Sequence, residues 1–402
     1  MNTPQPTSAA SRRLRLTPHL LCAYQACVMA ILPMAVISIF WKQEIGLSLF
    51  SIMLIQGFFG LVMALFEFPS GYLADRLGYR RTLLLAATMG VIGWLVYARA
   101  DSVPWVLLAE ALLGIGLAFG SGCDDALLYS ALKATGDEAR YAQWTGRMRF
   151  WAQFGEGTGA LTAGLLYVTH VRLPFALQAG MTGLAFVAAL LMIEPARARP
   201  PAGRYLGQAL SMVRHVLVDD RALRALFAFG IVLNLASFTP VWLIQIYAVD
   251  AGLPTAYLGP LWAAANYVVA IGALLSHRLG RRSWRGTLIG CVALVALGYG
   301  GLAAITAIWG FAFYYALTLM RGLQAPLLVH AQQRRIPDTD RAGFLSLASL
   351  VFRLSFLLLG PAVGWLADQH GQRPVLWGLG AVLVTLATLA WRAIRRAGVD
   401  AG

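Results

Sequence analysis

Long runs of apolar residues, separated by short polar connections, fill almost the whole chain. A helix that crosses a membrane needs about 20 consecutive, mostly apolar residues. Twelve stretches meet this requirement, and the predicted spans are 19–40, 48–75, 82–99, 104–132, 144–169, 174–193, 223–249, 254–277, 286–304, 307–333, 343–369 and 373–392. The pattern therefore predicts an all-α integral membrane protein with twelve transmembrane helices.

One connection, 194–222, is much longer than the others. It opens on a run rich in Pro and Arg, and its later part, Tyr205 to Val218, carries apolar residues at helical spacing. Such a segment is typical of an amphipathic helix that lies on a membrane surface. The chain is therefore expected to form a six-helix bundle over 1–193, a cytoplasmic linker over 194–222 and a second six-helix bundle over 223–402.

The composition agrees with a membrane protein and excludes several other classes. Apolar residues make up 59% of the chain and charged residues 12%, with a mean hydropathy of +0.66. Soluble domains carry about a quarter charged residues, so a soluble enzyme, a disordered protein and a disulfide-stapled secreted domain are excluded. The four cysteines lie inside apolar runs and form no C-x-x-C pair, so neither a metal site nor a disulfide framework is suggested.

The net charge of +14 is interpreted as a topology signal rather than as nucleic-acid binding, which needs a basic face on a soluble body. If both termini lie inside, only four of the 32 basic residues fall in outer connections: Lys42, Arg99, Arg172 and Arg373. Basic residues accumulate in cytoplasmic loops. The sequence therefore predicts cytoplasmic N and C termini.

Between the second and third spans the chain reads Gly71-Tyr-Leu-Ala-Asp75-Arg76-Leu-Gly78-Tyr79-Arg80-Arg81. This run resembles the signature loop of the major facilitator superfamily, G-x-x-x-D-R-x-G-R-R, with Tyr79 in a usually basic position. A second copy in the other half, 273–282, lies 202 residues later and has His277 in place of the Asp. The resemblance implies two pseudo-symmetric six-helix bundles that transport a solute by alternating access. It marks as gating residues Gly71, Asp75, Arg76, Gly78, Arg80 and Arg81.

Two further runs resemble motifs of this superfamily. The run Glu67-Phe-Pro69-Ser70-Gly71 resembles a subgroup that includes drug and metabolite exporters. The fifth span resembles the antiporter pattern G-x8-G-x3-G-P-x2-G-G, which implies export, although generic packing of small residues is the alternative. The positions that carry this pattern are Gly146, Gly155, Gly159, Ala160 and Gly164, with Ala160 in place of the Pro. A similar run, Gly364 to Arg373, ends span eleven on the outer face and is therefore not expected to be the gate loop.

Acidic residues at membrane depth need a partner or a function, because an exposed charge there is costly. Glu67, Glu110 and Glu156 are candidates for the coupling proton, since burial raises the pKa of a carboxyl group. A structural pair with Arg147 or Arg149 is the alternative for Glu67 and Glu156. Glu110 stands where many proton-driven exporters have Arg, so it either carries a proton or pairs with a cationic substrate.

Asp124 and Asp125 lie toward the cytoplasmic end of span four. The resemblance implies that one of them joins Arg76 or Arg80 in a latch that forms in only one transport state. The alternative is a solvated carboxylate in a packed helix.

Several polar side chains in other spans are candidates for lining a substrate cavity. A guanidinium group cannot shed its proton, so each Arg inside a span needs a carboxylate, a carbonyl or an anionic ligand. Either these groups neutralise one another, or the substrate has anionic or multidentate oxygen groups. The candidates are Tyr24, Gln25, Asn234, Asn266, Arg321 and Arg353.

No Walker loop, H-E-x-x-H run or nucleophile elbow is present, so neither ATP hydrolysis nor an enzyme is expected. The function that emerges is proton-coupled efflux of a drug, siderophore or metabolite across a bacterial inner membrane. The alternative is a proton-coupled importer or a facilitator of a small anionic or polar metabolite. We expect a monomer in the lipid bilayer that takes a small-molecule substrate, uses the proton gradient, and needs no cofactor, metal or nucleic acid.

Overall fold

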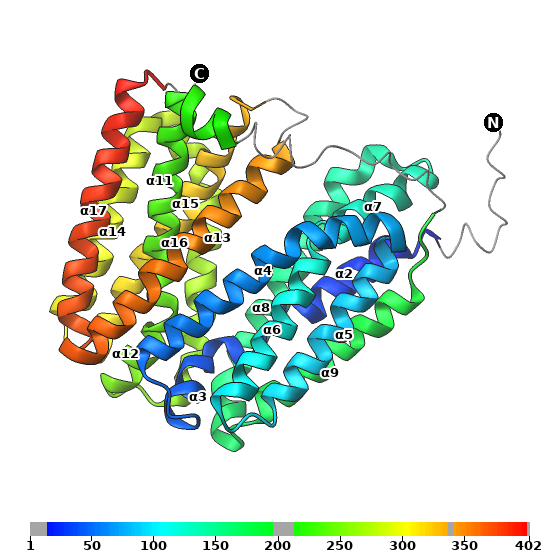
Figure 1. Cartoon of the computed structure of the whole chain (residues 1–402), viewed down its shortest axis with the longest axis horizontal. Helices are drawn as coiled ribbons and strands as arrows, with labels where there is room; N and C mark the ends of the chain where they lie inside the picture. The colour runs from blue at the N-terminus through cyan, green and yellow to red at the C-terminus, as the bar shows by residue number, and fades with distance from the viewer. Residues whose placement is uncertain (1–13, 196–212, 337–340, 400–402) are drawn as a thin grey trace. The chain divides into compact units, whose positions relative to one another are not determined.

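The computed structural model describes residues 14–195, 213–336 and 341–399, and these residues form helices and connections without a strand (Figure 1). They divide into two compact units. The first unit contains residues 14–37 and 58–195, and the second contains residues 38–57, 213–336 and 341–399. The predicted division into 1–193, 194–222 and 223–402 stays a prediction.

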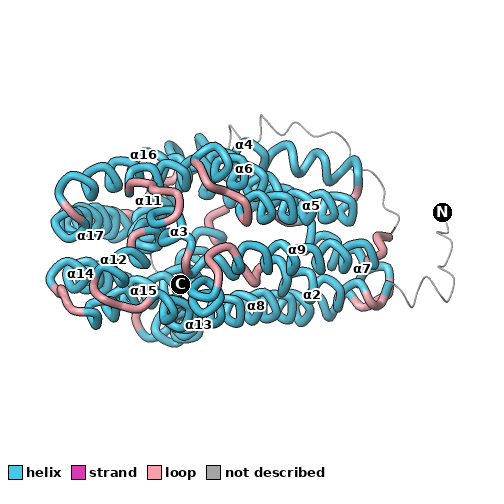
Figure 2. Tube along the Cα trace, turned by 90° about the horizontal axis from the view of Figure 1, so that it is seen from below, coloured by secondary structure: helices cyan, strands magenta, loops and turns pink. Residues whose placement is uncertain are grey.

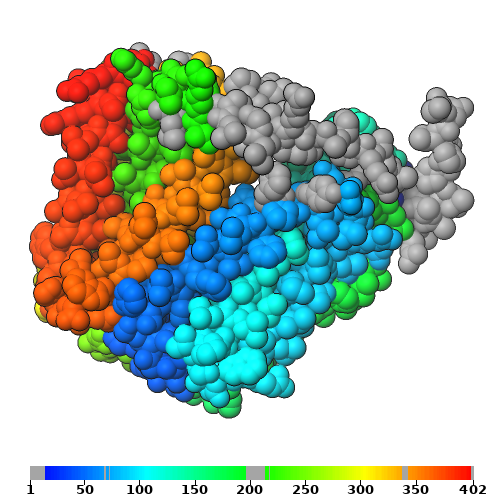
Figure 3. Space-filling view, viewed as in Figure 1, coloured from blue at the N-terminus to red at the C-terminus, as the bar shows by residue number. Residues whose placement is uncertain are grey.

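The first unit is a bundle in which α2 packs against α8 and α9, and α5 packs against α6 and α9 (Figure 2). In the space-filling view, the side chains of α4, α5 and α6 cover the visible face of this unit (Figure 3). Its helices are α2 (Thr17–Val28), the later part of α4 (Leu49–Leu77), α5 (Tyr79–Tyr97), α6 (Val103–Gly120), α7 (Cys123–Ala134), α8 (Tyr141–Thr169) and α9 (Leu173–Leu191).

The second unit pairs α13 with α15, and packs α17 against α11 and α14. Its helices are most of α3 (Ile37–Gln43), the start of α4, α11 (Arg221–Phe238), α12 (Ile244–Asp250), α13 (Leu258–Arg282), α14 (Trp284–Ala304), α15 (Tyr314–Gln333), α16 (Arg341–His370) and α17 (Gln372–Arg396). The shorter helical turns of the second unit are η3 (His215–Asp219), η4 (Thr239–Trp242), η5 (Thr255–Tyr257) and η6 (Ile308–Phe313), and those of the first unit are η1 (Leu32–Ala35) and η2 (Glu138–Arg140). All are 3₁₀ turns except η3, which is a π-helical turn.

The helices suit a lipid environment. Nine helical segments within the described residues are long and apolar enough to cross a membrane. Large apolar side chains such as Leu165, Leu274 and Leu358 are 65%, 77% and 78% exposed, as expected for helices whose outer faces contact lipid. The chain is therefore a multi-pass membrane protein, and the count of twelve spans in two six-helix halves stays a prediction.

Three predicted spans are not continuous helices. The first span, 19–40, breaks between α2 and α3, and the seventh, 223–249, breaks between α11 and α12. Pro33 and Pro240 start the short η1 and η4 turns, because proline cannot donate to the helical ladder. The fourth span, 104–132, divides at Gly122, whose φ of 76° ends α6 and starts α7. An apolar run therefore predicts that a segment crosses the membrane, but it does not predict that the segment forms one continuous helix.

The predicted linker helix, Tyr205 to Val218, lies mostly outside the described residues, which resume at 213. Its end forms η3, a short π-helical turn. Val216 of this turn is fully buried in a cluster with Leu223, Phe227, Ile336 and Phe344. This cluster anchors the start of α11 to the end of α15 and to α16.

Candidate functional site

The signature run does not form a loop. Asp75 and Arg76 lie in the last turn of α4, Arg80 and Arg81 lie in the first turn of α5, and Gly78 alone joins the two helices. Gly78 has a φ of 98°, a value that residues other than glycine rarely adopt. A Cβ atom at Gly78 would lie 2.7 Å from Oε2 of Glu194. The backbone conformation therefore requires glycine at this turn, and a Cβ atom there would also displace the Glu194 carboxylate.

Glu194 caps the first turn of α5. Its Oε1 accepts a hydrogen bond from the backbone N–H of Tyr79, and its Oε2 accepts one from that of Arg80, both at 2.9 Å. A carboxylate at a helix N-terminus satisfies free N–H groups and complements the helix dipole. The sequence analysis missed this residue, although it is the first charged residue after the apolar run of span six.

Arg80 makes the reciprocal contact with the other helix end. Its guanidinium donates hydrogen bonds to the carbonyl groups of Ala189, at 3.2 Å, and Leu190, at 2.7 Å. These carbonyls belong to the last turn of α9, where a positive charge is favourable. Glu194 and Arg80 thus join the start of α5 to the end of α9, and we call this pair of contacts the α5–α9 clasp.

A cleft of about 560 Å³ lies beside the α5–α9 clasp. It brings together most of the gating residues that the sequence singled out, and places Glu194 among them. The charged residues that line it are Asp75, Arg76, Arg80, Arg81 and Glu194. Gly71 is not among the lining residues, and a Cβ atom there would have no neighbour within 4 Å.

The two aspartates at the start of α7 have different partners. Asp124 is buried, and its Oδ2 accepts a hydrogen bond from the side-chain amide of Gln25 on α2. Asp125 forms an ion pair with Arg149 on α8, with 2.8 Å between Oδ2 and the guanidinium nitrogen. In this structure the hydrogen bonds of Arg80 go to backbone carbonyls of α9, so the latch between these aspartates and the signature arginines stays a prediction.

The candidate acids of the other spans lie in separate surroundings. Glu110 is 3% exposed and accepts a hydrogen bond from the hydroxyl of Tyr97, within an aromatic cluster that includes Trp94 and Phe175. Glu67 on α4 and Glu156 on α8 are half-buried. The structure therefore places Glu110 between packed helices.

The arginines that the sequence offered as partners for Glu67 and Glu156 have other contacts. Arg149 is paired with Asp125, and the guanidinium of Arg147 lies 4.8 Å from the ring centre of Trp144.

The glycines of the fifth span bring α8 into backbone contact with α2. A Cβ atom at Gly155 or Gly159 would overlap the carbonyl oxygen of Ala26 or Ala30, respectively. Ala160 and Gly164 are also buried, whereas a Cβ atom at Gly146 would meet nothing within 4 Å. The middle of the motif is therefore a contact between two backbones, and its first glycine is not part of it.

This contact lies beside the interruption between α2 and η1. Ile31 has a φ of 32°, a strained value for a β-branched residue. The Oε1 atom of Gln178 on α9 accepts a hydrogen bond from Leu32 N–H at 3.1 Å, and its amide nitrogen donates to the carbonyls of Cys27 and Val28 at 3.4 Å. Backbone groups that a break releases inside a membrane need such partners. Gln178 was missed in the sequence, where its only signal is an isolated amide in an apolar run.

Two of the predicted cavity residues lie in the first unit. Tyr24 is buried, and its hydroxyl donates a hydrogen bond to the carbonyl of Leu83 at 3.3 Å. Gln25, as described above, is bound to Asp124.

The polar residues of the second unit form smaller groups. Asn234 on α11 accepts a hydrogen bond at 2.9 Å from Gln324 on α15, a buried amide that the sequence analysis missed. Arg353 donates to Ser349 on its own helix at 3.1 Å, and Arg321 is exposed. The amide nitrogen of Asn266 is buried and has no hydrogen-bond partner among the described residues. Asn234 and Gln324 are thus paired by the fold, while Asn266 keeps an unused donor.

Comparisons with known proteins agree with the geometry. The family model described as Major Facilitator Superfamily matches residues 20–358. The chain is 26% identical over 348 residues to the tetracycline resistance protein, class G, of Vibrio anguillarum, which covers 81% of this chain and 83% of that protein. It is 25% identical over 354 residues to the inner membrane transport protein YajR of Escherichia coli K12, over 83% of this chain and 73% of that protein.

A solved structure shows the same fold. The crystal structure of the nucleoside transporter NupG superposes with a TM-score of 0.78 at 13% sequence identity. The superposition covers 95% of this chain and 99% of that chain. At this identity the likeness concerns the fold alone.

Proposed function

The chain belongs to the major facilitator superfamily of membrane transporters, and on that premise we propose that it exports a small organic solute in exchange for protons. Membership makes it a transporter rather than an enzyme. The proposed membrane is the bacterial inner membrane, with both termini in the cytoplasm, because few basic residues fall in the outer connections. The proposal also includes a monomer and two six-helix halves that alternate between inward and outward access.

The observation that carries export is the contact between α8 and α2. The glycine spacing of the fifth span resembles the antiporter pattern, and Gly155 and Gly159 place this pattern against the backbone of α2. Small residues at such positions let two helices approach closely and slide or tilt without side-chain obstruction. Resistance to tetracycline in the name of the class G relative supports the same direction.

For proton coupling we propose Asp124, together with the earlier candidates Glu67 and Glu156. Asp124 is buried and bound to Gln25, which is itself on α2, next to the α8 contact. Protonation of the carboxyl group would change its hydrogen bond with Gln25, because a protonated acid can donate as well as accept. We assign Glu110 a structural role, since Tyr97 already binds it inside a packed aromatic cluster.

For substrate contact we propose Asn234 and Gln324, together with Asn266, Arg321 and Arg353 on α13, α15 and α16. These groups offer amide and guanidinium donors, which suits a substrate that carries several oxygen acceptors. The side-chain amide nitrogen of Asn266 has no hydrogen-bond partner among the described residues.

For gating we propose the residues of the 560 Å³ cleft. The α5–α9 clasp joins two helix ends of the first unit beside this cleft. We propose that Asp75, Arg76 and Arg81 take part in the contact that changes between states.

An importer or facilitator is the second candidate. It stands as the alternative because the close contact between α8 and α2 also suits generic packing of small residues. In a vesicle, a proton antiporter accumulates substrate when the interior is acidic and a proton symporter accumulates it when the interior is alkaline. A facilitator accumulates it under neither gradient.

Transport into inverted membrane vesicles tests the proposal. With the interior acidified, we expect uptake of at least one compound from a panel of tetracycline and other anionic, neutral and cationic solutes. Asp124→Asn should abolish the dependence of uptake on the gradient. Glu138→Gln is the matched control, because Glu138 is an exposed acid on η2.

Uptake that ignores the gradient would overturn the export proposal and favour a facilitator. Gradient-driven uptake that survives in Asp124→Asn and is lost in Glu67→Gln or Glu156→Gln would move the coupling proton to that residue.

A further inference from the structure

A cavity of about 800 Å³ lies within the second unit, at the corner where α13 ends and α14 begins. Both helices are candidate membrane spans, so the corner between them lies at the level of the lipid headgroups. Among the described residues that line it, none is acidic. The lining residues that are cationic or can become so are His277, Arg281, His330, Arg334 and Arg335.

This corner is the second copy of the signature run. The first copy carries Asp75, whereas the second carries His277 at the corresponding position. The exchange removes the one acid from a run that contains Arg278, Arg281 and Arg282. In the first unit, the proposed gate is lined by acidic and basic side chains. In the second unit, the corresponding run lines a cavity with basic side chains.

The wall of the cavity includes a tryptophan whose indole N–H is buried and, in the described part of the chain, unpaired. Trp284 is 7% exposed and lines the cavity, and its indole Nε1–H has no hydrogen-bond partner among the described residues. Buried donors are nearly always satisfied in folded proteins. An indole N–H can only donate, so the group that completes this site is an acceptor.

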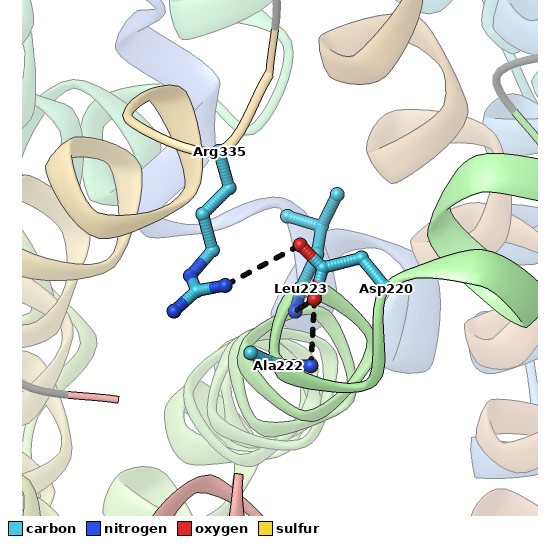
Figure 4. Close-up of polar contacts among 4 residues, drawn as sticks. All are labelled: Asp220, Ala222, Leu223 and Arg335. Carbon is cyan, nitrogen blue, oxygen red and sulfur yellow. Dashed lines mark hydrogen bonds and ion pairs between the residues drawn. The ribbon is translucent and has the colours of Figure 1, made fainter. Parts of the chain in front are cut away.

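Asp220, an acidic residue beside this lining, already has hydrogen-bond and ion-pair partners. Asp220 accepts hydrogen bonds from the backbone N–H groups of Ala222 and Leu223, at 2.8 and 3.0 Å, and forms an ion pair with Arg335 at 3.4 Å (Figure 4). Partial burial acts to raise the pKa of the Asp220 carboxyl group. The hydrogen bonds from Leu223 and Ala222 and the charge of Arg335 outweigh burial, so its pKa lies below the usual value. Asp220 therefore balances Arg335 and leaves the positive charge of Arg281 in the cavity.

An apolar groove of about 460 Å³ adjoins the same corner. Leu279 and Arg282 line the groove, while the intervening Gly280 and Arg281 line the cavity, so the end of α13 separates the two. Along α14 the groove follows Gly286, Gly290, Leu294 and Leu297. A Cβ atom at Gly290 would meet nothing within 4 Å, so the groove is open there.

We propose that this corner binds one anionic phospholipid, with its phosphate in the cationic cavity and an acyl chain in the groove along α14. A phosphate places a hydrogen-bond acceptor beside the Trp284 indole and supplies the negative charge that the Arg281 guanidinium attracts. Basic pockets between transmembrane helices are suited to anionic headgroups. A free phosphate would satisfy the cavity but would leave the adjoining apolar groove without an occupant, and this favours the lipid.

Lipid binding to the purified, delipidated full chain tests the proposal. We expect dioleoylphosphatidylglycerol to bind more tightly than dioleoylphosphatidylcholine, as measured by native mass spectrometry. Arg281→Gln should weaken phosphatidylglycerol binding about fivefold, the usual effect of one basic side chain near an anionic surface. Trp284→Phe, which removes the N–H and keeps the ring, should weaken it by a smaller factor.

Arg278→Gln is the matched control, since Arg278 lies on the same turn of α13 but does not line the cavity. Equal losses in Arg278→Gln and Arg281→Gln would overturn the site, as would equal binding of the two lipids. Inorganic phosphate or glycerol phosphate that binds as tightly as phosphatidylglycerol would overturn the lipid assignment. Thermal melting of each variant checks that it is folded.

Discussion

At the scale of single residues, buried polar side chains hold the irregular backbone of the first unit together. Gln178 binds both sides of the break in α2, Gln25 binds Asp124, and Glu194 caps α5. The hydrogen bonds of Gln178 to the backbone are buried or part-buried, and those of Gln25 and Glu194 are part-buried. These polar residues therefore contribute to which helix ends lie next to one another.

Replacing Gln178 by Leu should destabilise the first unit. Leu keeps the volume but leaves the N–H of Leu32 without its acceptor, at a cost of about 1–3 kcal/mol for a buried backbone group. The measurement is thermal unfolding of the detergent-purified protein. Thr385→Val on the exposed side of α17 is the control, and equal melting temperatures for Gln178→Leu and wild type would contradict the account.

Asp220 should make the second unit sensitive to acid. Its folded-state pKa lies below the usual value of about 3.9, so its contribution to stability is complete above that value and is lost as the pH falls through the folded-state pKa. Asp220→Asn should therefore lower the melting temperature at neutral pH, and the difference from wild type should shrink below about pH 4. A difference that stays constant down to acidic pH would show that the charge of Asp220 does not matter.

Single residues were the least predictable level of the site. The sequence singled out Asp124 and Gln25 separately, for a gate and for a cavity, and the structure joins them. Glu194 and Gln324 were missed. A polar residue in or beside an apolar run shows that a partner is needed, but the partner is set by packing between segments far apart in the chain.

At the scale of helices, the apolar pattern predicted where the helices lie but did not predict where they are interrupted. The apolar runs correspond to helices, and the signature run marks the junction of α4 and α5. The breaks after α2, α6 and α11 were not predicted, although Pro33, Gly122 and Pro240 lie at or near them. Proline and glycine also occur within continuous helices, as Pro69 and Pro361 do here, so neither residue alone predicts a break.

Asp368 shows why similar runs can differ in role. It belongs to a run that resembles the signature, yet its two carboxylate oxygens accept hydrogen bonds from the N–H groups of Leu49 and Phe50, at 2.9 and 2.8 Å. It therefore caps the start of α4 within the second unit. The sequence analysis did not expect this run to be the gate loop, and the structure adds that Asp368 caps α4.

Adding one methyl group at Gly159 should disrupt the contact between α8 and α2. In Gly159→Ala the new Cβ would overlap the carbonyl of Ala30, and overpacking of this kind costs about 1–3 kcal/mol. We expect lower thermal stability and reduced transport. Gly146→Ala is the control, because that position has open space, and equal effects of the two variants would show that the motif does not act through packing.

At the scale of the whole molecule, the sequence predicted the superfamily and its transport function, and the family match supports both. The predicted division into two six-helix bundles and a linker stays a prediction, and contacts in the structure group residues 38–57 with the second unit. This grouping rests on contacts such as the Asp368 cap, which join residues more than 300 positions apart. Transport direction and substrate depend on differences between states, which neither apolar runs nor helix positions encode.

The central claim, exchange of protons for a solute, is tested most directly in proteoliposomes that contain a pH-sensitive dye. After a substrate has been identified, its addition should move protons across the membrane in the opposite direction, and Asp124→Asn should abolish this movement while substrate still binds. Solute transport with no proton movement would contradict the account and leave a facilitator, and proton movement in the same direction as the solute would show an importer.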